Sequence, residues 1–178
     1  MLPIPSRMLE LVVYDSARVV TGDATFALNF NTSRDGATTI DLDPSAVPRF
    51  WFVIDLAIAR DNAVALFGPP PQELIVAPRD DEVRAALLES TRWYCRHGGD
   101  ADATLLAASR AWNSMNTGHW ASKSAAAQWA SERLAATDLE LAKAVAMAVG
   151  ARAGERAHNA DVHAHAIRLV DRVVATIG

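Results

Sequence analysis

The feature that most constrains the fold is a change of hydrophobic pattern at Pro48. Before it, residues 8–14 (MLELVVY) are rich in strand-forming residues, and residues 24–30 (ATFALNF) follow a period of two. After it, residues 50–64 (FWFVIDLAIARDNAV) are apolar on most faces of a helix that a proline can start. The sequence therefore predicts strands followed by a buried helix, in which a buried Asp55 needs an ion-pair or hydrogen-bond partner.

The segments on either side of that helix complete the predicted order of elements. Asp43-Pro44 predicts a turn, and the residues around Ile40 allow one short strand. Beyond the prolines at 69–71, helical spacing recurs at about residues 80–95, 100–117, 122–134, 137–150 and 155–177. Ser122 is a cap residue for the third of these helices, and Thr137 with Glu140 forms a capping box for the fourth.

These elements predict an α+β, mostly α chain. A strand layer spans residues 1–47, and a helical domain with a bundle of about five helices spans residues 48–178.

Composition excludes several functions. The net charge is −4 and no run of Lys or Arg occurs, which argues against a nucleic-acid or anionic-membrane surface. Cys95 is the only cysteine, so neither an internal disulfide nor a multi-cysteine zinc site can form. The opening MLPIPSRMLE lacks the apolar segment of a signal peptide, and the apolar run at residues 50–59 is too short to span a bilayer. We therefore expect a cytoplasmic protein without nucleic-acid or membrane partners.

Lys123 is the residue whose position most suggests chemistry. It follows Ser122 in the first turn of a predicted helix, where backbone N–H groups and the positive end of the helix dipole favour phosphate. A solvated surface lysine is the alternative interpretation of the same position.

Four segments carry a resemblance to a known family: WFVIDLAIARDNAVALFGPPPQEL, RWYCRHGGD, LLAASRAW and TGHWASKSAAAQW. In this order they resemble the carboxyl-terminal part of the aminoglycoside adenylyltransferases, antibiotic-resistance enzymes that inactivate spectinomycin and streptomycin. The likeness runs from about residue 10 to residue 150. It implies remnant strands of a nucleotidyltransferase sheet followed by a helical domain, and a parent reaction in which ATP and Mg²⁺ serve adenylyl transfer to an antibiotic hydroxyl.

The resemblance also assigns roles to individual residues. Glu10 corresponds to the family carboxylate that acts as general base on the drug hydroxyl. Arg110 and Lys123 correspond to a pair that binds the triphosphate. Asp100 and Trp93 correspond to residues that contact the antibiotic, and a carboxylate with an aromatic face suits a small cationic sugar.

The family's metal-binding loop, a Gly-Ser followed by Asp-x-Asp, does not occur in this sequence. The Asp-x-Asp at Asp41-Leu-Asp43 follows the predicted strands and has no such loop before it. Met1 is thus expected to lie inside the family's first domain, and we predict no metal ligands in this chain. Adenylyl transfer needs a divalent metal between carboxylates and phosphates, so the chain is expected to be partial or inactive alone. An incomplete sheet would leave a strand edge, which predicts a homo-oligomer or a partner chain there.

Two other functions fit the same sequence. One is a non-catalytic helical module for ligand binding or dimerisation. The other is a ribonuclease, because Arg152 and His158 resemble the Arg-to-His spacing of the HEPN helical ribonucleases. His158, Asp161 and His165 share a helical face, which we interpret as an exposed polar face rather than a metal site.

Overall fold

The structure, a computed structural model, describes residues 9–32, 37–97, 101–153 and 163–177. The chain divides into two compact units, Met1–Val83 and Arg84–Gly178. The predicted boundary between a strand layer (residues 1–47) and a helical domain (residues 48–178) stays a prediction.

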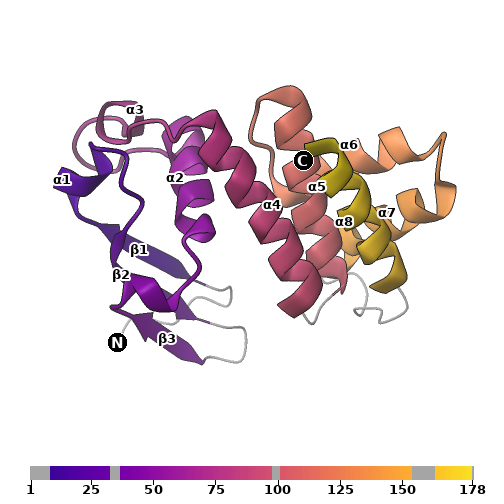
Figure 1. The fold of residues 1–178 in the computed structure, drawn as a ribbon, viewed down its shortest axis with the longest axis horizontal. Coiled ribbons are helices and arrows are strands. Elements are labelled where there is room, and N and C mark those ends of the chain that lie inside the picture. Colours follow the sequence, from indigo (N-terminus) through magenta and orange to yellow (C-terminus); the bar gives the residue numbers. More distant parts are fainter. Residues whose placement is uncertain (1–8, 33–36, 98–100, 154–162, 178) are drawn as a thin grey trace. The chain divides into compact units, whose positions relative to one another are not determined.

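The strands of the first unit form one small antiparallel sheet (Figure 1). Its order is β1-β2-β3, where β1 is Glu10–Tyr14, β2 is Phe26–Thr32 and β3 is Thr38–Asp41. A short helix, α1 (Ser16–Val19), follows β1 and is capped by the side chain of Asp15. All three predicted strands are confirmed, including the short one at Ile40.

One face of the sheet carries an exposed apolar row. Leu11 on β1 pairs with Phe30 on β2, and Phe30 pairs with Ile40 on β3. Leu11 is 50% exposed and Ile40 is 60% exposed. Within the described residues β1 pairs only with β2, so its outer edge lies at the margin of the sheet.

Helix α2 (Phe50–Asn62) supplies the apolar core of the first unit. Its Phe52 ring packs 4.5 Å from Phe26 and 6.4 Å from Tyr14, measured between ring centroids. The helix buries Phe50, Phe52, Val53, Ile54, Leu56 and Ala57, as predicted. The expectation that Asp55 is buried is wrong, because its side chain lies on the exposed side of the helix.

Two short helices flank α2. The 3₁₀ helix η1 (Pro44–Ala46) precedes it and is capped by Asp43, whose side chain accepts from the Ser45 N–H at 2.9 Å. Helix α3 (Pro71–Leu74) follows it. Arg60 donates to the Gln72 carbonyl at 3.1 Å, and the Gln72 amide donates back to the Arg60 carbonyl at 2.6 Å. These reciprocal bonds fasten α3 to the end of α2.

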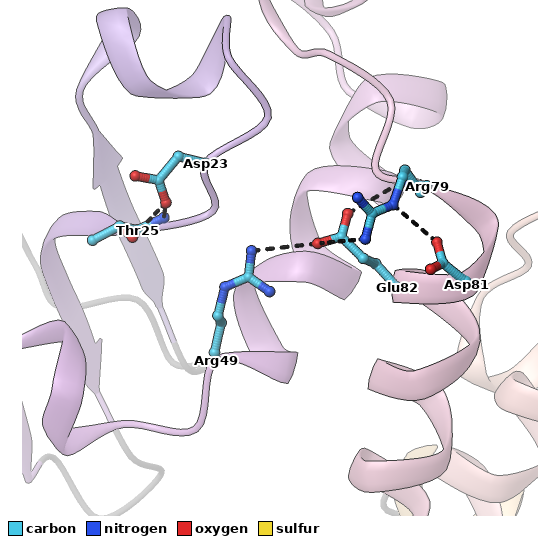
Figure 2. Close-up of polar contacts among 6 residues, drawn as sticks. All are labelled: Asp23, Thr25, Arg49, Arg79, Asp81 and Glu82. Carbon is cyan, nitrogen blue, oxygen red and sulfur yellow. Dashed lines mark hydrogen bonds and ion pairs between the residues drawn. The ribbon is translucent and has the colours of Figure 1, made fainter.

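Charged side chains surround the start of helix α4 (Asp80–His97), as Figure 2 shows. Arg79 donates to Asp81 at 3.0 Å, and this hydrogen bond lowers the pKa of Asp81. Glu82 lies between two guanidinium groups, 3.7 Å from Arg49 and 3.9 Å from Arg79. Carboxylates in a first helical turn also favour the helix dipole, so these residues fix where α4 begins.

The second unit is the predicted helical bundle, formed by α4, α5 (Ala101–Thr117), α6 (Lys123–Leu134), α7 (Leu139–Ala153) and α8 (His163–Ile177) (Figure 1). Helix α5 packs against α6, α7 and α8. All five helices contribute buried side chains to the core, which include Leu87, Leu105, Leu134, Leu141, Val145, Leu169, Val173 and Ile177. The fold class predicted from the sequence is confirmed.

The ends of these helices follow local chemistry with one exception. Gly118 has φ +70° and ends α5, and Ser122 caps α6. At α7 the predicted capping box is wrong. Asp138, not Thr137, accepts from the Leu141 N–H, at 3.2 Å, and it is held there by Arg168 from α8.

Helix α8 is confirmed from His163 onward. The residues before it, including His158 and Asp161, lie outside the described residues. No helix in the described ranges is long and apolar enough to cross a membrane.

Candidate functional site

Lys123 is the first residue of α6 and is half-buried. The hydroxyl of Ser122 accepts from the Ala125 N–H at 3.1 Å, which fixes the first turn. The Lys123 Nζ lies 3.4 Å from the hydroxyl oxygen of Tyr94 and 5.3 Å from the centroid of its ring. The ammonium group is therefore held near a helix N-terminus, the arrangement that favours an anion.

Tyr94, the residue that contacts Lys123, belongs to an aromatic cluster at the end of α4. The Trp93 ring meets the Tyr94 ring edge-on at 5.5 Å and stacks on the His97 ring at 5.3 Å, with 28° between the planes. The Thr104 hydroxyl on α5 donates to the Tyr94 carbonyl at 3.2 Å. The cluster thus joins side chains of α4, α5 and α6 in one compact unit.

Of the other binding residues predicted from the sequence, one lies in this cluster, one lies on a neighbouring helix and one is not described. Trp93 is half-buried within it. Arg110 is half-buried on α5, a helix that packs directly against α6. Asp100 lies outside the described residues, so its predicted contact with a cationic sugar stays a prediction.

Glu10 lies in the other compact unit, on β1. Its side chain is exposed, and its cross-strand neighbour is Asn31. Its predicted role as general base stays a prediction.

The potential metal ligands of the described residues do not gather in a larger cluster. No group of three or more His, Cys, Asp or Glu side chains in the described ranges could hold a metal ion. Asp41 accepts from the Asn29 amide at 3.2 Å. Asp43 is occupied in capping η1, and its pKa is lowered by the hydrogen bonds from Ser45. Asp41 and Asp43 therefore both accept hydrogen bonds from nearby residues.

The rival ribonuclease site is only partly described. Arg152 is exposed near the end of α7, and its predicted partner His158 falls outside the described ranges. That alternative stays a prediction. Of the predicted polar face of His158, Asp161 and His165, only His165 is described, half-buried with its Nδ1 3.5 Å from Arg168.

Tyr94 is the residue that sequence reasoning missed as part of the site. Its side chain meets Lys123 across 29 positions of sequence. No local pattern gives such a contact. The stacking of Trp93 on His97, by contrast, follows from their i,i+4 spacing on one helix face.

The sheet followed by a helical bundle is the architecture of a known nucleotidyltransferase structure. The chain aligns with the crystal structure of spectinomycin adenyltransferase from Enterococcus faecialis, solved with ATP and spectinomycin, at a TM-score of 0.72. The alignment covers 92% of this chain and 67% of that one, with 20% sequence identity. At that identity the match establishes the fold.

The family follows from the sequence comparison. Residues 74–175 match the family model described as aminoglycoside adenylyltransferase, C-terminal domain. The chain therefore belongs to this family, and the predicted resemblance is confirmed.

Individual relatives match over about half of this chain. An aminoglycoside (3'') (9) adenylyltransferase of Klebsiella pneumoniae is 42% identical over 90 residues, which are 47% of this chain and 34% of the relative. A spectinomycin 9-adenylyltransferase of Staphylococcus aureus is 34% identical over 89 residues, 49% of this chain and 34% of the relative. The chain thus spans about a third of the length of the curated relatives it matches.

Proposed function

We propose that this chain is an aminoglycoside nucleotidyltransferase-like protein whose helical unit binds a nucleotide triphosphate through Lys123 and Arg110. The observation that carries the proposal is the placement of the Lys123 ammonium in the first turn of α6, beside Tyr94. Backbone N–H groups at a helix start and a fixed cation together suit a phosphate group. ATP is the proposed nucleotide, because the related structure was solved with ATP.

The antibiotic part of the proposal uses Trp93 and Asp100. The Trp93 ring offers a half-buried aromatic face, a suitable partner for a cationic sugar. Spectinomycin is the first candidate, because it is bound in the structural relative.

We further propose that these 178 residues do not transfer an adenylyl group by themselves. Glu10 can serve as a general base, which contributes roughly 10²–10⁴-fold, far below typical enzymatic accelerations. The described residues hold no group of three or more potential metal ligands. Mg²⁺ therefore enters the proposal only as a companion of the nucleotide phosphates.

Calorimetric titration with ATP tests the binding proposal directly. Lys123→Ala is expected to weaken ATP binding at least about tenfold, because it removes a charge-assisted hydrogen bond worth about 1.5–3 kcal/mol. Lys143→Ala is the matched control, since Lys143 lies on the exposed face of α7 and pairs with Glu140 at 2.9 Å. No heat with the wild type, or equal affinities for both variants, contradicts the proposal.

The absence of transfer is tested with the purified 178-residue chain, ATP, Mg²⁺ and spectinomycin. We expect mass spectrometry to find unmodified antibiotic. Adenylylated antibiotic, formed at a rate that Glu10→Gln abolishes, contradicts this part of the proposal and leaves nucleotide binding intact.

The second candidate function is association, with a second copy of the chain as the proposed partner at the β1 edge. The exposed apolar row and the outer edge of β1 favour it. Analytical ultracentrifugation is expected to show a dimer for the wild type and a monomer for Leu11→Lys. Leu139→Lys, at an exposed apolar residue of α7, is the matched control that stays dimeric. A monomeric wild type excludes this function.

We also propose a cytoplasmic location. The half-buried free thiol of Cys95 suits a reducing compartment. Fractionation of cells that express the chain tests this, and recovery outside the cytoplasm contradicts it.

A further inference from the structure

We propose that Tyr94 is a positioning residue, which holds the Lys123 ammonium in place for phosphate before any nucleotide arrives. This inference rests on the proposed function of Lys123. Its starting point is the dual contact between the two side chains. The Nζ lies 3.4 Å from the tyrosine hydroxyl and 5.3 Å from the centroid of the same ring. One residue thus supplies both a hydrogen-bond acceptor and an electron-rich face.

Tyr94 is suited to this role because it is itself held from two sides. Its carbonyl accepts from the Thr104 hydroxyl on α5 at 3.2 Å, and its ring meets Trp93 at 5.5 Å with 88° between the planes. The side chain is half-buried at the end of an 18-residue helix. A lysine that contacts this ring is therefore tied to α4 as well as to its own helix.

The contact with Tyr94 reduces the conformational entropy that the Lys123 side chain loses when phosphate binds. A lysine side chain has four rotatable bonds, and ordering it when a phosphate binds is entropically costly. A contact that already restricts the side chain reduces that cost. An ammonium group carries three N–H donors, so a hydrogen bond to Tyr94 is compatible with one to phosphate. We expect Tyr94→Leu to weaken ATP binding about three- to tenfold, in line with the loss of a hydrogen bond and a cation–π contact.

The composition of the chain permits a direct test of the contact without nucleotide. Lys123 and Lys143 are the only lysines in the sequence. Reductive methylation with ¹³C-formaldehyde therefore gives two lysine NMR signals beside that of the terminal amine, and Lys123→Arg assigns them. We expect the Lys123 signal to move in Tyr94→Leu, while the Lys143 signal stays in place as an internal control. An unchanged Lys123 signal overturns the inference.

The second part of the test separates positioning from a purely structural role. Tyr94→Phe keeps the ring and removes the hydroxyl, so we expect its ATP affinity to fall between those of the wild type and Tyr94→Leu. A structural role alone predicts full affinity for Tyr94→Phe, and equal affinity in all three proteins overturns the inference. If the wild type binds no ATP while the Lys123 signal still responds to Tyr94→Leu, the contact is real, and both the proposed function and the positioning role are excluded.

Discussion

The buried hydroxyl of Tyr14 makes a prediction about stability that can be worked out from its surroundings. Within the described residues this oxygen has no hydrogen-bond partner, although it is buried. A buried hydroxyl that has lost its water without gaining a partner costs about 1–3 kcal/mol. Tyr14→Phe removes that oxygen and keeps the ring that meets Phe52 at 6.4 Å. We therefore expect the free energy of unfolding of the sheet to rise by about 1 kcal/mol.

The same substitution changes the response to alkaline pH. Burial, and secondarily the negative charge of Asp55, raises the pKa of Tyr14. An unfolded tyrosine ionises near about pH 10, so above that pH the unfolded state loses a proton that the folded state retains. The stabilisation from this group is complete below that pH and is lost as pH rises. Tyr14→Phe is expected to abolish the part of the alkaline loss of stability that the ionisation of Tyr14 causes.

Native-state hydrogen exchange at the paired amides of β1 and β2 is the appropriate assay, because it measures local opening in a chain with two compact units. Tyr94→Phe is the control, since Tyr94 is the only other tyrosine and its hydroxyl is bonded to Lys123. It is expected to bring no stabilisation to β1 and β2. A loss of 1 kcal/mol or more in Tyr14→Phe would refute the reasoning, because it would mean that the hydroxyl is satisfied.

Three further predictions concern the pKa of one carboxylate, one helix cap and the core. The Thr25 hydroxyl and N–H both donate to Asp23 (Figure 2) and lower its pKa, so the stabilisation from this carboxylate is present above about pH 4 and is lost as pH falls below that value; Thr25→Val is expected to raise that pKa in an NMR titration. Ser122→Ala removes the cap of α6 and is expected to cost about 1 kcal/mol, measured as faster exchange of the Ala125 amide. Leu134→Ala, at a fully buried position, is expected to cost about 3 kcal/mol in urea unfolding, and a loss below about 1 kcal/mol contradicts its place in the core.

The elements that could be predicted from sequence are those fixed by neighbouring residues. Ser122 caps α6 through a bond to a residue three positions away, and Gly118 ends α5 because glycine readily adopts positive φ. The choice between Thr137 and Asp138 as the cap of α7 could not be predicted in this way. Both residue types suit a cap, and a contact from α8 to Asp138 accompanies the observed choice.

The candidate site shows the same limit. The place of Lys123 at a helix start follows from the local sequence, and it was predicted. Its contact with Tyr94 joins two helices and depends on how they pack, which no spacing in the sequence reveals. The outward position of Asp55 was missed for a related reason, since a helix apolar on most faces does not indicate which side meets solvent.

The apolar row of the sheet has a consequence for handling the protein. Leu11 and Ile40 are exposed on strands that carry no lysine or proline, the residues that commonly discourage edge-to-edge aggregation. Concentrated samples are therefore expected to scatter light and to bind apolar dyes. A lysine on the outward face of β1 is the substitution to try first when crystals or spectra require a well-behaved solution.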